Sequence, residues 1–153
     1  MRIAIIFLIS TFLFGVEIKF SKEINITKKP IILIFDTKTC PYCEKLKRDL
    51  TTNKELKKEA DSFDIYQIPR DRPTTYKIFG VESNTQMLEM LYKVKVSPYI
   101  VILDSKGNKV WQIPGYIDPF KLSKLLKFTK ALEKGEVKRE NWKEFLLKEG
   151  VFK

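Results

Sequence analysis

Cys40 and Cys43 are the only cysteines in the chain, and two residues, Pro41 and Tyr42, separate them. At this spacing the two sulfur atoms can close into a small disulfide ring across the first turn of a helix. A C-x-x-C pair at a helix start is typical of a redox-active dithiol, which alternates between a reduced and a disulfide form. The motif therefore points to thiol–disulfide exchange.

The position of each cysteine predicts its role in that exchange. We expect Cys40 at the N-terminus of a helix, where unpaired backbone N–H groups and the positive end of the helix dipole favour a thiolate. A thiolate is the attacking species, and cysteines in such motifs have pKa values of roughly 3.5 to 7.5. Pro41 suits the first helical position, because its φ is already helical. Cys40 is thus the candidate nucleophile, and Cys43 is the candidate resolving cysteine.

Other uses of a C-x-x-C pair stay open at this point. A zinc site needs four ligands, and the chain has no histidine and no further cysteine. A c-type haem motif requires a histidine after the second cysteine, where Glu44 stands instead. Two thiolates can hold Cu(I), and a structural disulfide is geometrically feasible, although so small a loop stabilises little. We expect no metal and no cofactor beyond the Cys40–Cys43 disulfide.

The segments on either side of the cysteines predict the elements that hold them. Residues 31–36 are almost entirely apolar, as expected of a central strand that is covered on both faces. A helix is predicted from residue 41 to residue 60, with a break near residues 51–53. The dithiol therefore lies where a buried strand turns into a helix.

A second informative segment is Ser97-Pro98, which precedes an apolar strand. A proline cannot donate to a β-ladder, so it belongs at the start or edge of a strand. Residues 104–108 have the composition of a hairpin turn, and residues 109–113 predict the returning strand. Antiparallel pairing is therefore expected in this part of the sheet.

The rest of the chain carries weaker patterns. The predictions are an edge strand at 17–20, a short helical turn at 21–24, a strand at 63–67, a surface loop at 68–76 and a helix at 84–92. Asp118 and Pro119 predict the cap and first residue of a further helix. A last short helix at 141–148 has Trp142 and Phe145 available to pack back on the domain. The order of elements predicts an α/β fold, with a central mixed β-sheet and helices on both faces.

The N-terminus has the pattern of a secretory signal peptide. Met1-Arg2 is followed by an uncharged apolar run that ends near Gly15 and is shorter than the roughly 18 residues of a spanning helix. We expect residues 1–16 to be a signal peptide or an N-terminal anchor, although a buried strand or core helix has a similar composition. Residues 17–134 are then one domain, and residues 135–153 a helical extension packed on it. Export implies a periplasmic or other oxidising compartment, where disulfides persist.

The net charge of +10 allows nucleic acid, anionic membranes or acidic proteins as partners. The lysines are interspersed with glutamates, as in residues 54–59, which is typical of solvated helix faces. We therefore expect no nucleic-acid binding. Separately, we expect a monomer that is soluble after signal cleavage.

The chain resembles the thioredoxin superfamily over residues 31–129, through the strand–Cys40-Pro41-Tyr42-Cys43–helix unit and through Ser97-Pro98 before the hairpin. The resemblance implies a thioredoxin-like fold and a cis peptide bond at Pro98. It further implies that Ser97 and Pro98 bind an extended substrate segment beside Cys40, through main-chain hydrogen bonds.

The sequence departs from an ordinary thioredoxin at the site itself. Thr39 replaces the family tryptophan, and Pro41-Tyr42 replaces Gly-Pro, as in glutaredoxins. Ile34 stands where thioredoxins hold a buried acid, and we expect nearby Asp36 to end the strand in solvent rather than approach the dithiol. The segment between the second strand and Pro98 resembles exported thioredoxin-like proteins, including the SoxW-like type associated with bacterial sulfur oxidation.

The resemblance implies an exported thiol–disulfide oxidoreductase that exchanges disulfides with protein substrates through Cys40 and Cys43, with reduction as the favoured direction. A disulfide oxidant or isomerase and a Cu(I) carrier are the alternatives. A reductase outside the cytoplasm also implies a membrane-bound relay that supplies electrons.

Overall fold

The computed structural model describes residues 15–152, and residues 1–14 and 153 lie outside the described part. Almost all of the predicted signal segment, residues 1–16, therefore falls outside the described residues. Within residues 15–152, no helix is long and apolar enough to span a membrane.

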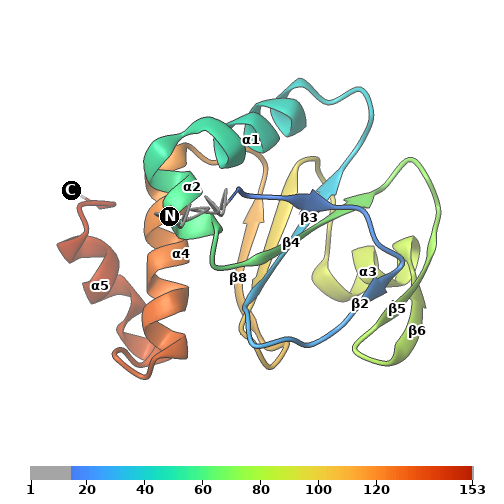
Figure 1. The fold of residues 1–153 in the computed structure, drawn as a ribbon. Helices are drawn as coiled ribbons and strands as arrows, with labels where there is room; N and C mark the ends of the chain where they lie inside the picture. Colours follow the sequence, from blue (N-terminus) through green and yellow to red (C-terminus); the bar gives the residue numbers. More distant parts are fainter. Residues whose placement is uncertain (1–14, 153) are drawn as a thin grey trace, which may run out of the picture.

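A five-stranded mixed sheet forms the centre of the described part of the chain (Figure 1). Its strands lie in the order β1 (Ile18–Lys19), β4 (Asp64–Pro69), β3 (Ile31–Asp36), β7 (Tyr99–Leu103) and β8 (Lys109–Pro114). The central strand β3 runs parallel to β4 and antiparallel to β7, and β8 returns antiparallel beside β7. The predicted α/β fold with a mixed sheet is confirmed.

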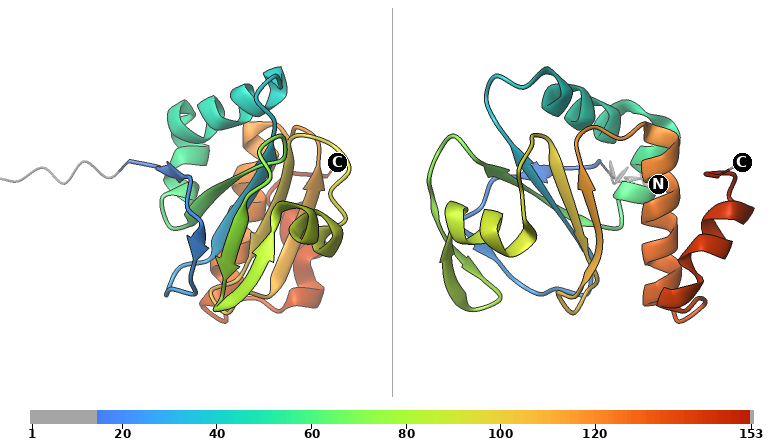
Figure 2. Two further views of the ribbon diagram at one scale, coloured as in Figure 1. Left: turned by 90° about the vertical axis from the view of Figure 1, so that its right-hand side faces the viewer. Right: turned by 180° about the vertical axis from the view of Figure 1, so that it is seen from behind.

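Alternate side chains of β3 enter two hydrophobic clusters, one on each face of the sheet. Ile32 and Ile34 pack with residues of three helices, α1 (Pro41–Thr52), α2 (Lys54–Ala60) and α4 (Pro119–Glu133). Leu33 and Phe35 pack on the opposite face with residues of α3 (Thr85–Tyr92). Figure 2 shows this division from two further sides, with α3 well separated from α1 and α4. Both faces of the strand that leads to Cys40 are thus covered.

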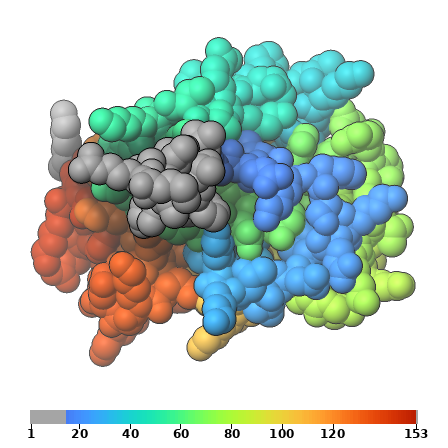
Figure 3. Space-filling model, viewed as in Figure 1, coloured from blue at the N-terminus to red at the C-terminus, as the bar shows by residue number. Residues whose placement is uncertain are grey.

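A second sheet covers the α3 side of the molecule and was not predicted. Within residues 15–152 it has three strands, β2 (Glu23–Ile24), β5 (Thr75–Ile78) and β6 (Val81–Asn84), in that order. β2 runs parallel to β5, and β5 runs antiparallel to β6. Seen from the side of Figure 1, the segment that contains β1 and β2 lies on the surface, between the helices and strands β5 and β6 (Figure 3).

Two predictions are wrong in this region. Residues 21–24 do not form a helical turn, because the backbone of Glu23–Ile24 pairs with β5, a partner that is distant in sequence. Residues 68–76 are not one surface loop, since Ile68 and Pro69 complete β4 and buried Tyr76 belongs to β5. The prolines and charges of this stretch mark only a short connection, and strand formation beside it depends on non-local pairing.

The predicted break in the active-site helix is confirmed at Asn53. Its backbone N–H donates to the carbonyl oxygen of Asp49 at the end of α1, at 2.9 Å. Its side-chain Oδ1 accepts from the backbone N–H of Leu56 at 3.0 Å, which caps the start of α2. One residue therefore ends α1 and begins α2. The helix predicted at 84–92 is confirmed as α3, where Leu88 is buried while Met87 and Leu91 are exposed.

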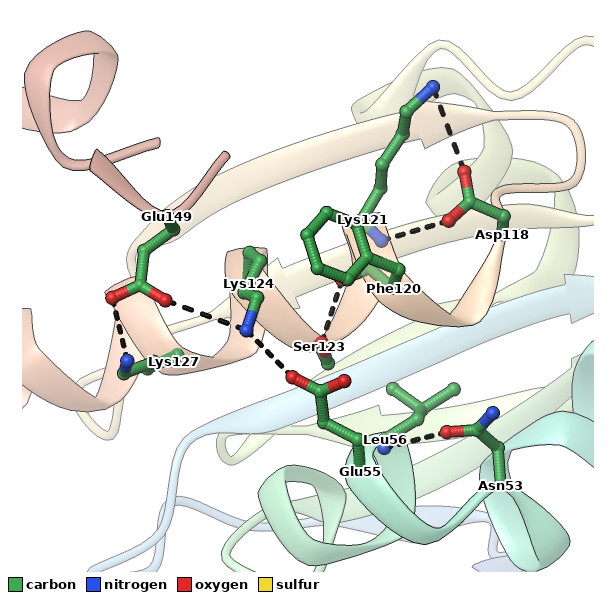
Figure 4. Close-up of polar contacts among 10 residues, drawn as sticks. All are labelled: Asn53, Glu55, Leu56, Asp118, Phe120, Lys121, Ser123, Lys124, Lys127 and Glu149. Atoms are coloured by element: carbon green, nitrogen blue, oxygen red, sulfur yellow. Dashed lines mark hydrogen bonds and ion pairs between the residues drawn. The ribbon is translucent and has the colours of Figure 1, made fainter. Parts of the chain in front are cut away.

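The helix predicted after Asp118 is confirmed as α4. Asp118 accepts a hydrogen bond from the backbone N–H of Lys121, and Pro119 is the first helical residue. Lys124 of α4 lies 2.6 Å from a carboxylate oxygen of Glu55 on α2 and 3.5 Å from one of Glu149 (Figure 4). These ion pairs join α4 to both of its helical neighbours.

The C-terminal residues pack back on α4 and β8. A 3₁₀ turn (Arg139–Asn141) leads into α5 (Trp142–Lys148). The rings of Trp142 and Trp111 meet edge to face with their centroids 5.7 Å apart. The rings of Phe145 and Phe128 also meet edge to face, with their centroids 5.3 Å apart. These contacts bury aromatic surface that α4 and β8 would otherwise expose.

Candidate active site

Cys40 and Cys43 form a disulfide, with their Cα atoms 5.2 Å apart. Cys40 is the N-cap of α1 and has extended backbone, and Pro41 follows as the first helical residue. The backbone N–H of Cys43 donates to the Cys40 Sγ at 3.2 Å. Cys43 is fully buried, whereas Cys40 is partly exposed. An incoming sulfur atom can therefore reach Cys40 more readily than Cys43.

Ser97 and Pro98 lie at the same edge of the sheet as the dithiol. The β3–β7 register pairs Phe35 with Tyr99, so Pro98 comes next to the end of β3, from which the chain turns toward Cys40. The Ser97–Pro98 peptide bond is cis, and the carbonyl oxygen of Pro98 accepts from the backbone N–H of Gly115 at 2.8 Å. Pro98 itself is buried and Ser97 is partly exposed.

Tyr42 forms an aromatic pair with Tyr116 beside the dithiol. Their ring centroids are 5.8 Å apart, and 61% of Tyr42 is exposed. The Tyr116 hydroxyl donates to Asp49 at 2.7 Å, and the Lys45 ammonium group contacts the same hydroxyl. Sequence reasoning missed Tyr116, because it follows β8 and no local signal links it to Tyr42 on α1.

The prediction for Asp36 is wrong, because its side chain is buried rather than solvated. Only 1% of Asp36 is exposed. Its Oδ2 lies 3.2 Å from the Lys47 Nζ and accepts from the Gln67 side-chain amide at 2.8 Å. Among the residues that the structure describes, Oδ1 has no hydrogen-bond partner. The strand does not end in water at Asp36, because Lys47 of α1 and Gln67 of β4 cover it.

Burial raises the pKa of Asp36, since desolvation disfavours the carboxylate more than Lys47 and Gln67 favour it. Desolvation acts on Lys47 too, but its contacts with Glu44 and Asp36 outweigh that effect, so the pKa of Lys47 is raised. These groups line a polar cavity of about 510 Å³ next to the N-terminal half of α1. The dithiol helix is thus joined to the end of β3 by a polar cluster around the buried Asp36.

Comparisons with known proteins agree with this architecture. A thioredoxin-fold protein from Helicobacter pylori is similar at 23% identity and a TM-score of 0.73, covering 85% of this chain and 89% of that one. A thioredoxin-like protein from Clostridium perfringens matches at 22% identity and a TM-score of 0.52, covering 81% of this chain and 91% of that one. Thioredoxin from Malassezia sympodialis matches at 15% identity and a TM-score of 0.55, covering 76% of this chain and 93% of that one.

These identities are low, so the likeness concerns the fold. No curated protein matches the sequence. A family model described as a thioredoxin-like domain matches residues 21–130, which include the dithiol, Ser97 and Pro98. Because the model spans most of the chain, and the chain has the corresponding fold, the protein belongs to the thioredoxin-like domain family.

Proposed function

We propose that the protein is an exported thiol–disulfide oxidoreductase that reduces disulfides of other proteins. One observation carries the proposal: the partly exposed Cys40, at the N-terminus of α1, is in a disulfide with the fully buried Cys43. This arrangement leaves one sulfur open to a partner and keeps the other behind it, as exchange through a mixed disulfide requires.

In the reduced protein the first helical turn favours a thiolate at Cys40. This thiolate attacks one sulfur of a substrate disulfide, forms a mixed disulfide and expels the other substrate sulfur as a thiolate. Cys43 then loses its proton and attacks the Cys40 Sγ, which releases the second substrate thiolate. The substrate gains two electrons, and the protein is left with the Cys40–Cys43 disulfide.

Substrate recognition in this proposal falls to Ser97 and Pro98. They lie where β7 begins, at the edge of the sheet shared with the dithiol. An extended substrate segment can hydrogen-bond to the backbone of Ser97, and main-chain pairing of this kind accepts varied side chains. Such recognition suits an enzyme that acts on many proteins.

Export is proposed from the first sixteen residues, where an apolar run follows Arg2. A location outside the cytoplasm agrees with an exported thioredoxin-like protein of the SoxW-like type. In that location a membrane-bound relay would return electrons to the dithiol. Expression of the full chain in a Gram-negative host, followed by fractionation and mass determination of the N-terminus, tests the export. A full-length protein confined to the cytoplasm would contradict it.

Two single substitutions test the chemistry in an insulin-reduction assay. Cys40→Ser should abolish the reduction of insulin disulfides, because the attacking thiolate is lost. Cys43→Ser should also stop turnover, but it should accumulate a mixed disulfide with insulin that mass spectrometry detects. If Cys40→Ser reduces insulin as fast as the wild type, the proposed function is wrong.

The direction of exchange follows from the reduction potential of the pair, measured in glutathione buffers with the thiols read by alkylation and mass. A value below about −230 mV would agree with a reductase. A value above about −180 mV is typical of oxidants and isomerases and would overturn the proposed direction.

A further inference from the structure

Arg70 contacts three parts of the molecule beside the proposed substrate-binding residues. It follows β4, and its backbone N–H donates to the carbonyl oxygen of Asp36 at the end of β3, at 2.8 Å. Its Nε donates to Oε1 of Glu89 on α3 at 2.6 Å. Its Nη1 donates to the Oγ of Ser97 at 3.0 Å. One side chain thus connects α3 to the residue before Pro98.

Glu89 lies in the last turn of α3, and Ser97 lies near the end of the segment that connects α3 to β7. α3 ends at Tyr92, and its C-cap Lys93 has a φ of 54°. The backbone N–H of Val94 donates back to the Glu89 carbonyl oxygen at 2.8 Å. Two exposed residues then lead to Ser97. Arg70 therefore links the last turn of α3, through Glu89, to the far end of the segment that follows it, through Ser97.

The character of these contacts suits a rigid support. The side chains of Arg70 and Glu89 are only 21% and 25% exposed, so their ion pair is partly shielded from water. Shielded, hydrogen-bonded pairs hold their partners more firmly than exposed surface pairs do. The planar guanidinium can donate to Glu89 and Ser97 at once from fixed directions, which a lysine ammonium group at the end of a flexible chain cannot reproduce.

We propose that Arg70 is a positioning residue for substrate recognition. It holds Ser97 in the place where the backbone of that residue can pair with an extended substrate segment. The inference rests on the proposed function, because it gives Ser97 a part in binding a protein disulfide. In this inference Arg70 affects substrate binding, whereas the thiol–disulfide exchange itself is carried out by Cys40 and Cys43.

The first test measures KM and kcat for insulin with Arg70→Gln, with dithiothreitol supplying electrons. KM should rise about tenfold, the effect of losing one hydrogen bond to a charged group, while kcat changes far less. Arg70→Lys should raise KM as well, because lysine keeps the positive charge but lacks the planar guanidinium group that donates to Glu89 and Ser97 at once. The matched control is Arg72→Gln, an exposed neighbour whose guanidinium lies over the Phe20 ring, and it should keep the wild-type KM.

A second variant removes the same contact from its other end. Ser97→Ala should raise KM to a similar degree, and the double variant with Arg70→Gln should be no worse than either single variant. Additive effects would mean that the two residues act separately, and would overturn the inference. If Arg70→Gln proves poorly folded, Ser97→Ala alone still tests the contact, because it leaves the Arg70–Glu89 ion pair in place. An unchanged KM for Ser97→Ala would then overturn the inference.

Hydrogen exchange separates this inference from the proposed function. The backbone amides of residues 93–97 should exchange faster in Arg70→Gln than in the wild type, with the core strands unchanged. Failure of the wild type to reduce insulin would refute the proposed function, whereas the exchange rates would still decide whether Arg70 holds this segment. Unchanged exchange of residues 93–97 in Arg70→Gln would overturn the inference. Faster exchange with an unchanged KM would overturn it too, because the position of this segment would then not affect substrate binding.

Discussion

The carboxylate of Asp36 lies 3.2 Å from the ammonium group of Lys47. Asp36 is the last residue of β3, the strand that leads to the dithiol. Lys47 is one helical turn beyond Cys43, so this ion pair joins the end of β3 to the helix that carries both cysteines. Desolvation raises the pKa of Asp36 despite the neighbouring cation. The charge state of the buried Asp36 should therefore affect the stability of the site.

The stability of the protein should depend on pH through Asp36. Because its pKa is higher in the folded than in the unfolded protein, the folded state binds more protons between the ordinary value of 3.8 and the raised value. The free energy of unfolding should thus fall as the pH rises through that window. Asp36→Asn has no such group, so its stability relative to the wild type should increase over the same window. Urea unfolding at a series of pH values measures the difference, and parallel curves would refute the assignment.

Removing the cation should expose the cost of the buried carboxylate. Lys47→Met should lower the free energy of unfolding at neutral pH by about 1 to 3 kcal/mol, the penalty for an unpaired buried polar group. The loss should shrink as the pH falls toward 3.8, because Asp36 then takes up a proton. Lys58→Met, at an exposed position on α2, is the matched control and should change little at any pH. An equal loss for both variants would contradict the prediction.

The parts of the site that could be predicted from sequence are those encoded locally. Cys40 and Cys43 share one helical turn, so their spacing alone places the two sulfurs within disulfide reach. The apolar run of β3, the helix break near Asn53 and the cap at Asp118 also depend on residues within a few positions of each other. Short-range chemistry of this kind is read directly from the order of residues.

The parts that could not be predicted depend on residues brought together by the fold. Asp36 is buried because Lys47 and Gln67 cover it from two other elements, and neither neighbour is evident from the strand itself. The pairing of β2 with β5 and the contact of Arg70 with Ser97 are likewise distant in sequence. Each of these errors or omissions concerns a polar or short segment whose structure is decided by tertiary contacts.

The C-terminal helix should contribute to global stability through one buried side chain. Leu146 is 1% exposed, whereas its neighbour Leu147 is 55% exposed. Leu146→Ala should lower the free energy of unfolding by about 2 to 3 kcal/mol, through lost burial and a residual cavity. Leu147→Ala is the matched control and should cost less than about 0.5 kcal/mol. Urea unfolding with a single cooperative transition checks both values, and equal effects would mean that α5 does not unfold together with the domain.

The exposed ring of Tyr42 should matter for substrate recognition and little for stability. It lies within the C-x-x-C motif and packs on Tyr116, so a substrate bound at Cys40 would meet this aromatic surface. Exposed aromatic side chains at contact surfaces often contribute about 1 to 2 kcal/mol to binding, so Tyr42→Ala should lower kcat/KM for insulin roughly 5- to 30-fold. Its unfolding free energy should stay within about 0.5 kcal/mol of the wild type.

Tyr42→Phe provides the matched control for this prediction, because it retains the ring and removes only the hydroxyl group. It should keep most of the wild-type kcat/KM, which would assign the effect to the aromatic face. Because Tyr42 also lies between the two cysteines, the reduction potential of each variant must be measured beside its kinetics. A potential that shifts enough to account for the slower reduction by Tyr42→Ala would assign the effect to redox balance and contradict a contact role for the ring.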